Sequence, residues 1–124
     1  MTPEHDKLLC EKYPKLFAQR NKPMNETAMC WGFECGDGWF DLVDRLCSLL
    51  QWDIDHNRQP QIEVTQVKEK FGSLRFYTDV ATDRQDGCIS MAESMSSRIC
   101  EVCGCPGATN TEGWLSTRCK KHRK

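Results

Sequence analysis

The stretch QIEVTQVKEKFGSLRFYTDV, residues 61–80, indicates how this 124-residue chain is built. β-Branched and aromatic residues are frequent in it, and apolar residues alternate with polar ones on both sides of a central Gly72. The alternating apolar residues are Ile62 and Val64 in the first half and Leu74 and Phe76 in the second. This pattern predicts an antiparallel β-hairpin that turns near Gly72 and buries one face.

Val67 and the residues around the turn modify this simple hairpin. Val67 interrupts the alternation of the first strand, so we expect a β-bulge or an early strand end there. Most of the hairpin should serve as core and sheet edge. Exposed Lys70, Phe71 and Arg75 at the turn would nevertheless form a contact surface.

The segment before the hairpin predicts an amphipathic helix from about residue 38 to residue 54. Its apolar residues recur at helical spacing, and polar residues fill the opposite face. The apolar positions are Trp39, Leu42, Val43, Leu46 and Leu50. Asp37, between two glycines, is placed to cap this helix.

The N-terminal segment predicts a helix that begins after Thr2. The Thr2 hydroxyl is a suitable cap, Pro3 suits the first helical position, and Glu4 adds an acid to the first turn. Pro14 lacks the N–H that a helix interior needs. We therefore expect two short helical pieces here.

A third helical stripe follows the hairpin. The sequence DRQDG at residues 83–87 predicts a turn, and the apolar stripe comes after it. The stripe consists of Cys88, Ala92, Met95 and Ile99, and it leads directly into Cys100. Together these elements predict an α+β fold, in which a short antiparallel hairpin or sheet packs with three to four helices. We divide it into a domain at residues 1–99 and a zinc-binding module, a ribbon or knuckle, at residues 100–124 packed on it.

Two pairs of metal-ligand residues form the strongest motif of the chain. Cys100-x2-Cys103 and Cys119-x2-His122 are separated by 15 residues. A two-residue gap lets both side chains of a tight turn face one centre, and Gly104 relaxes the turn after the second ligand. Three thiolates and one imidazole suit a single tetrahedral Zn²⁺ with no open coordination position. The sequence therefore predicts a structural zinc site.

Other interpretations of the cysteines remain open. Disulfides would leave one of the nine cysteines over and would not explain His122, and Cys105 is a rival ligand. Trp114 and Leu115, between the two pairs, are expected to cover the metal. Cys10, Cys30 and Cys35 could hold a second metal or act as nucleophiles, but burial of Cys30 and Cys35 beside Trp31 and Phe33 explains those two better.

Known catalytic motifs do not occur in the sequence. It has no zinc-deaminase pattern, phosphate-binding glycine loop or nucleophile elbow. The best enzymatic alternative would need a cleft that holds Cys35, Asp37 and His56 together. We expect a protein that is not an enzyme, and we infer no small-molecule substrate.

Charge is distributed unevenly along the chain. The formal net charge is −1, with −4 on residues 1–99 and +3 on residues 100–124. The basic residues of the tail, which include Arg118, Lys120 and Lys121, would balance the net negative charge of a Cys3His zinc site. Alternatively, they would contact phosphates, with Lys68, Lys70 and Arg75 as allies.

The sequence also bears on location. No apolar run approaches the ~20 residues that a membrane span needs. The first fifteen residues have neither the basic start nor the apolar core of a secretory signal. We expect a cytoplasmic protein without a membrane partner.

Three blocks of the chain together resemble a family of small, uncharacterised bacteriophage and prophage proteins. The blocks are GDGWFDLVDRL, QVKEKFGSLRFYTD and the C-terminal CEVCGCPG with its following Trp and TRC..H, and they cover residues 35–122. Cys105 departs from the family pattern, in which another residue precedes Pro-Gly. The resemblance implies a phage origin, action in the host cytoplasm, and a non-catalytic module that binds and inhibits a host protein, including a defence component. The alternative function is a nucleic-acid-binding zinc regulator.

Overall fold

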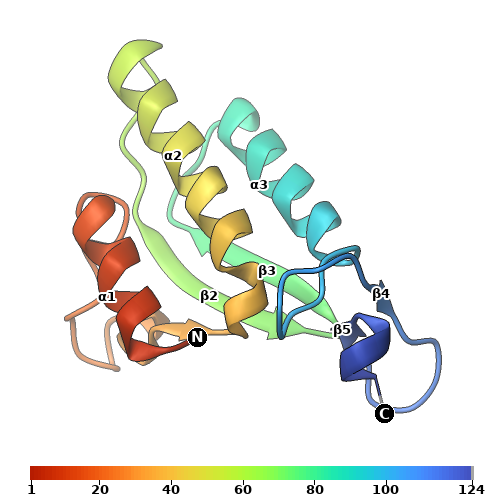
Figure 1. Cartoon of the computed structure of the whole chain (residues 1–124). Coiled ribbons are helices and arrows are strands. Elements are labelled where there is room, and N and C mark those ends of the chain that lie inside the picture. The colour runs from red at the N-terminus through yellow and green to blue at the C-terminus, as the bar shows by residue number, and fades with distance from the viewer. Residues whose placement is uncertain (124) are drawn as a thin grey trace.

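The computed structural model describes residues 1–123, and Lys124, the last residue of the expected zinc module, lies outside the described residues. Helices and a small sheet form the α+β fold that the sequence predicts, with a cysteine cluster near the C-terminus (Figure 1). The α-helices are α1 (Pro3–Lys12), α2 (Phe40–His56) and α3 (Asp83–Ser96). The larger sheet has the order β1-β2-β3, and β4 pairs with β5 in a second sheet.

The predicted hairpin is present as β2 (Val64–Lys70) and β3 (Ser73–Thr78), which pair antiparallel. Phe71 and Gly72 form the turn, and both have positive φ. The expected irregularity is a register shift between Val64 and Gln66, earlier than Val67 itself. Because the extra residue restores the alternation, Val64 and Val67 both face the core and are fully buried.

A third strand, β1 (Phe33–Glu34), extends this sheet. It pairs parallel with β2, so that Phe33 is beside Val67 and Glu34 is beside Lys68. A two-residue strand leaves no alternation to detect, and the sequence did not predict it.

Helix α2 confirms the predicted amphipathic helix, but its N-terminus differs from the expectation. A short 3₁₀ turn, η2 (Asp37–Trp39), precedes it. Asp37 caps neither element. Its carboxylate accepts hydrogen bonds from the Thr2 N–H at 2.8 Å and from His5 Nδ1 at 2.9 Å. Asp37 therefore ties the start of the chain to η2.

Helix α3 begins earlier than predicted. The segment DRQDG is its first part and not a turn, because Thr82 and Gln85 form a reciprocal capping box that starts the helix. Its buried face contains Gln85, Ile89 and Ala92. Met95, expected in the apolar stripe, is 46% exposed.

Helix α1 begins as predicted and ends before Pro14. The Thr2 hydroxyl accepts a hydrogen bond from the His5 N–H, and Pro3 is the first helical residue. The second helical piece expected after Pro14 is instead a series of turns over residues 14–22.

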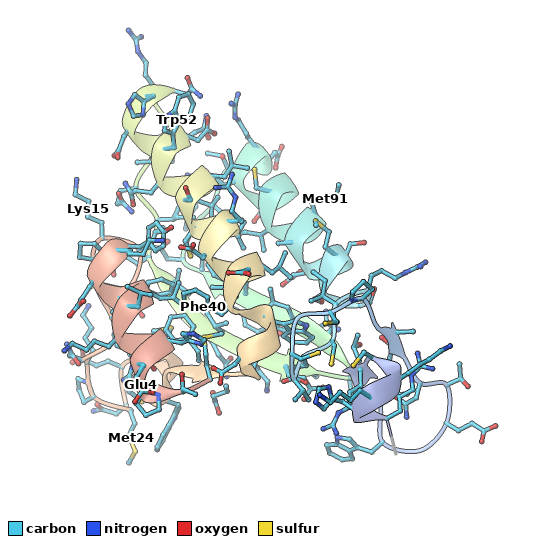
Figure 2. The ribbon with its side chains drawn as sticks, viewed as in Figure 1. Glu4, Lys15, Met24, Phe40, Trp52 and Met91 are labelled. Atoms are coloured by element: carbon cyan, nitrogen blue, oxygen red, sulfur yellow. The ribbon has the colours of Figure 1, made fainter. Side chains whose placement is uncertain are left out.

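The core lies between the sheet and the helices that cover it. Helices α2 and α3 lie side by side across the sheet, and α1 lies on the side of α2 opposite α3 (Figures 1 and 2). Trp39, Leu50 and Leu74 are among the fully buried side chains. None of the helices described for residues 1–123 has both the length and the apolar character needed to cross a bilayer.

Candidate metal centre

The four predicted ligands come from two turns on either side of a short β-ribbon. Cys100 and Cys103 lie in the turn after α3. The ribbon consists of β4 (Ala108–Thr109) and β5 (Thr117–Arg118). Cys119 follows β5 directly, and the 3₁₀ turn η3 (Lys120–His122) carries the imidazole back toward the first pair. The ribbon thus brings the second ligand pair against the first.

The four donor atoms are close enough together to hold one metal ion. All four lie within 4.8 Å of one another. Cys103 Sγ is 3.7 Å from Cys119 Sγ, and His122 Nδ1 is 3.7 Å from Cys100 Sγ and 3.2 Å from Cys119 Sγ. With ordinary zinc bond lengths, a tetrahedron has S···S edges of about 3.8 Å and S···N edges of about 3.6 Å. Cys100, Cys103, Cys119 and His122 could therefore hold one metal ion.

Backbone N–H groups prepare Cys100 to bind a cation. Burial raises the pKa of the Cys100 thiol, but hydrogen bonds from the N–H groups of Cys119, Cys103 and Val102 outweigh it, and the pKa falls to about 6. The Gly104 N–H closes the turn on the Cys100 carbonyl at 2.9 Å. Gly104 has a φ of +81°, which explains a glycine at this position.

Cys105 is outside the group of four. Its side chain is exposed, and its carbonyl accepts a hydrogen bond from the Cys100 N–H at 2.7 Å. All nine cysteines are free thiols, so disulfides do not organise this segment. Cys105 supports the turn through its backbone.

The GDG segment at residues 36–38 joins two parts of the chain. We call residues 1–99 the body and residues 100–123 the metal module. The Gly36 N–H donates to the Glu101 carboxylate, and the Gly38 N–H donates to the Glu101 carbonyl, both at 2.8 Å. A Cβ on Gly38 would lie 2.1 Å from the Cys100 carbonyl oxygen. The indole N–H of Trp39 adds a 2.9 Å bond to the Ile99 carbonyl. The glycines permit this backbone contact.

The hairpin turn docks on the other side of the metal module. The Thr117 hydroxyl donates to the Gly72 carbonyl, and a Cβ on Gly72 would lie 2.8 Å from Thr109 Cγ2. The three sequence blocks therefore meet at the metal module, although they are far apart in the chain.

Trp114 does not cover the metal, contrary to the expectation. Its side chain is 88% exposed, at the tip of the loop that joins β4 to β5. Gly113, at a φ of +71°, shapes this loop. Leu115 is half-buried and lines the hollow beside the hairpin turn. The polar residues that flank Trp114 in the sequence TEGWLS are the feature from which its exposure could have been predicted.

The candidate binding residues lie in two sets. Lys68 and Arg75 oppose each other across the hairpin, and Lys70 and Phe71 lie at its turn. In the metal module, Arg118 belongs to β5, and Lys120 and Lys121 belong to η3. The structure brings Lys70 and Phe71 to a hollow shared with Trp114. Sequence reasoning missed two acids nearby, Glu69 and Glu101.

The other cysteines form no comparable centre among residues 1–123. Cys35 is buried, and its burial raises the pKa of its thiol to about 12. Burial, followed by the charge of Asp6, raises the pKa of Cys10 to about 11. Trp31, expected to bury Cys30, is 61% exposed. The high pKa values of Cys10 and Cys35 are the opposite of what a nucleophilic thiolate needs.

Comparison with known proteins returned no similarity. No protein-family model matches the chain, and no curated protein or solved structure matches it.

Proposed function

We propose that this chain is a zinc-stabilised, non-catalytic binding protein. Zn²⁺ is the proposed ion because three thiolates and one imidazole are a donor set that it favours, with the S···S separation of 3.7 Å already suited to it. Four protein donors complete its coordination, so the ion would shape the fold and leave no position for a substrate or water.

An apolar groove between α2 and α3 is the observation that carries the binding function. It has a volume of about 730 Å³ and lies between the exposed sides of the two helices. Leu49 is 50% exposed and Met91 is 64% exposed, and Figure 2 shows Met91 on α3. Exposed apolar side chains gathered in one groove are typical of protein interaction sites.

The partner that fits this groove best is an amphipathic helix of another protein. The walls are two adjacent helices, and a third helix can place its apolar positions between them. Methionine side chains such as Met91 and Met95 adapt to varied apolar partners. Arg45 also lines the groove and makes no ion pair with the described residues, so it is available to a partner carboxylate.

We extend this proposal to inhibition of a host protein by a phage-type protein. The support is the resemblance of the three sequence blocks to small phage proteins, together with their convergence on the metal module. A protein of this kind would act by occupying a surface that its target needs, and a defence component of the host is one such target.

The arrangement of the polar residues favours binding over catalysis. The enzymatic alternative requires Asp37 and His56 in one cleft. Asp37 precedes α2 and His56 is the last of its 17 residues, so the length of the helix separates them. At 1.5 Å per residue, that distance is about 25 Å.

Affinity capture with matched variants tests the proposed function. The wild-type chain, a Leu49→Glu/Met91→Glu variant and a Val80→Glu control are used to capture proteins from host lysate after nuclease treatment. Val80 is 90% exposed and does not line the groove, so it controls for added charge. We expect the wild-type chain and V80E to capture the same partner. The groove variant should bind that partner at least tenfold more weakly, as measured by calorimetry with the purified partner.

Two results would contradict the proposal. One is a partner that binds the groove variant as tightly as wild type. The other is recovery of no protein partner by the wild-type chain.

A further inference from the structure

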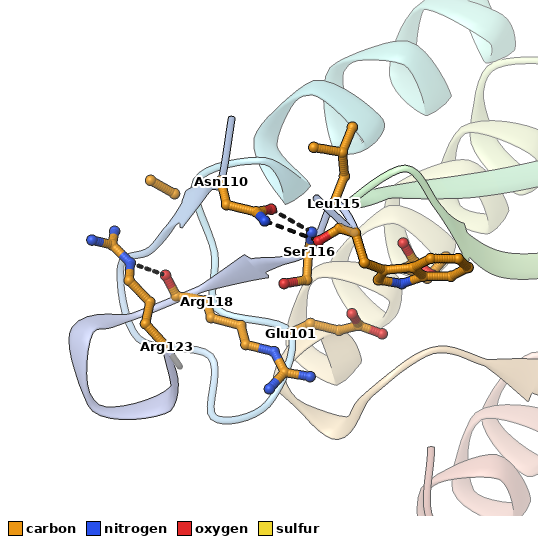
Figure 3. A pocket seen from close by; sticks show the side chains of 9 residues that line it. Glu101, Asn110, Leu115, Ser116, Arg118 and Arg123 are labelled. Atoms are coloured by element: carbon orange, nitrogen blue, oxygen red, sulfur yellow. Dashed lines mark hydrogen bonds between the residues drawn. The ribbon is translucent and has the colours of Figure 1, made fainter. Parts of the chain in front are cut away.

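A second surface lies at the end of the molecule where the hairpin turn meets the metal module, and it is separate from the α2–α3 groove. Two adjoining hollows, of about 380 and 410 Å³, share Glu69, Trp114 and Leu115. We call them together the tip cavity. Figure 3 shows the hollow of about 380 Å³, with Arg118 and Glu101 projecting toward the same region and Leu115 from the neighbouring loop.

Two exposed aromatic rings border the tip cavity. Trp114 is 88% exposed and Phe71 is 67% exposed, although rings of this size are usually largely buried. Neither ring takes part in an aromatic pair with the described residues, whereas exposed Trp52 stacks on His56 with ring centroids 4.7 Å apart. The faces of Trp114 are therefore available to a flat ligand, and so is the face of Phe71 that Lys70 does not cover.

Cations surround these rings. Arg118 and Arg123 line the hollow of Figure 3, and Lys70 Nζ lies 5.5 Å from the Phe71 ring centroid. Arg118 Nε is buried and has no hydrogen-bond partner among the described residues. Lys120 and Lys121 are exposed on the adjacent η3. These groups provide several positive charges close to two open ring faces.

Two carboxylates also face this space, and they restrict how a ligand can lie. Glu69 and Glu101 line the hollow of Figure 3. One Glu101 oxygen accepts the Gly36 N–H at 2.8 Å, and the other is free to accept. An anionic group would avoid these carboxylates and pair with the arginines. Their oxygens would accept hydrogen bonds from an amino group of a ligand.

We propose that the tip cavity binds single-stranded nucleic acid. An unpaired base stacks on Trp114 or Phe71, its exocyclic amino group donates to Glu101 or Glu69, and its phosphates pair with Arg118, Arg123 and Lys70. A duplex keeps its bases stacked inside and cannot offer a base face to Trp114. This proposal does not depend on the groove partner, because it uses different residues.

Fluorescence anisotropy with labelled 12-mers tests it. The probes are single-stranded oligo(dC), oligo(dT), oligo(rC) and a duplex of the same length, each at about 50 and 200 mM salt. We expect binding to oligo(dC) that exceeds binding to oligo(dT), which lacks an amino group, and that weakens with salt. Comparison of oligo(dC) with oligo(rC) separates DNA from RNA as the source.

The variants locate the site. Trp114→Ala should weaken oligo(dC) binding about 5- to 150-fold, the range expected for loss of one base-stacking contact of ~1–3 kcal/mol. Arg123→Ala should also weaken oligo(dC) binding. It should reduce the slope of log affinity against log salt concentration by about the value for one phosphate contact. Trp52→Ala removes a ring that is 54% exposed at the far end of α2, and it should leave binding unchanged.

Several outcomes would overturn the proposal. They are no binding to any probe at about 50 mM salt, equal binding to duplex and single strand, or an equal effect of W114A and W52A. Metal content measured for each variant ensures that a loss of binding is not a loss of the metal module. A protein partner that is lost in W114A while oligonucleotides do not bind would assign the surface to protein recognition instead.

Discussion

The body of the protein and its metal module are held together in different ways. Twenty buried hydrophobic residues from Leu9 to Ala92 form one core cluster, and Cys100, outside this cluster, is the one buried hydrophobic residue within residues 100–123. Cys100 is itself one of the four candidate metal donors. The body therefore depends on burial of apolar side chains, whereas the metal module has four donor atoms in place of a core.

Metal removal should produce the largest difference between the two parts. Cys103→Ser, or a strong chelator, should abolish metal binding and unfold residues 100–123, because a structural zinc contributes ~10–16 kcal/mol in short peptides. The body should keep its fold. Elemental analysis and amide hydrogen exchange, resolved by residue, measure both effects.

Cys105→Ser is the matched control for this experiment. It changes another exposed thiol two residues away, outside the group of donors, and should keep the metal. Undiminished metal in C103S, or loss of metal in C105S, would refute the assignment of ligands.

A cavity in the core should have the converse effect. Leu74 is fully buried on β3, so Leu74→Ala should lower the free energy of unfolding of the body by ~2–5 kcal/mol while the metal content stays unchanged. Denaturant titration of the metal-loaded protein measures it. Val80→Ala, at a 90% exposed position, should change stability by less than ~0.5 kcal/mol.

A substitution at the junction should affect both parts moderately. Gly38→Ala places a Cβ 2.1 Å from the Cys100 carbonyl oxygen, so the backbones must separate. We expect a loss of ~1–3 kcal/mol and faster hydrogen exchange around Cys100.

Gly87→Ala is the contrasting glycine variant. A Cβ at Gly87 meets nothing within 4 Å and lies within α3, so it should stabilise the protein by ~0.5–1 kcal/mol. A destabilisation of G87A as large as that of G38A would show that the contact at Gly38 is not the cause.

The smallest effect is expected at Asp53, in the body. The hydrogen bond from Asn57, and then the Arg84 guanidinium, hold the pKa of Asp53 below 3.8 against the opposing effect of burial. Its contribution to stability is therefore complete above about pH 4 and is lost as the pH falls through the lowered pKa. Asp53→Asn should flatten the decline of stability with acid in this range, as thermal melts at several pH values would record. The effect at neutral pH is limited because the Arg84 side chain is 60% exposed. An unchanged acid profile would contradict this role.

The sequence predicted the elements whose signals are local. Alternation around Gly72 predicted the hairpin, helical spacing predicted α2, and the two ligand pairs predicted the cluster of donors. In each of them, neighbouring residues in the chain carry the whole pattern.

Several failures involve contacts between distant residues, or local signals of opposite meaning. Asp37 bonds with Thr2 and His5 and not with the helix that it precedes. In α3, the capping box of Thr82 outweighed the turn signal of Asp86-Gly87. The exposure of Trp114 depends on how the ribbon folds back, which spacing does not reveal.

The docking of the metal module through glycines has a consequence for how such proteins can diverge. The contacts at Gly36, Gly38 and Gly72 involve main-chain atoms or the space that a missing side chain leaves. Residues 111–115 of the loop, which include Trp114, are not among the groups that meet these glycines. Its exposed positions, such as Trp114, are therefore free to change while Gly113 and the frame beneath the loop stay the same, so that recognition can change without a new fold.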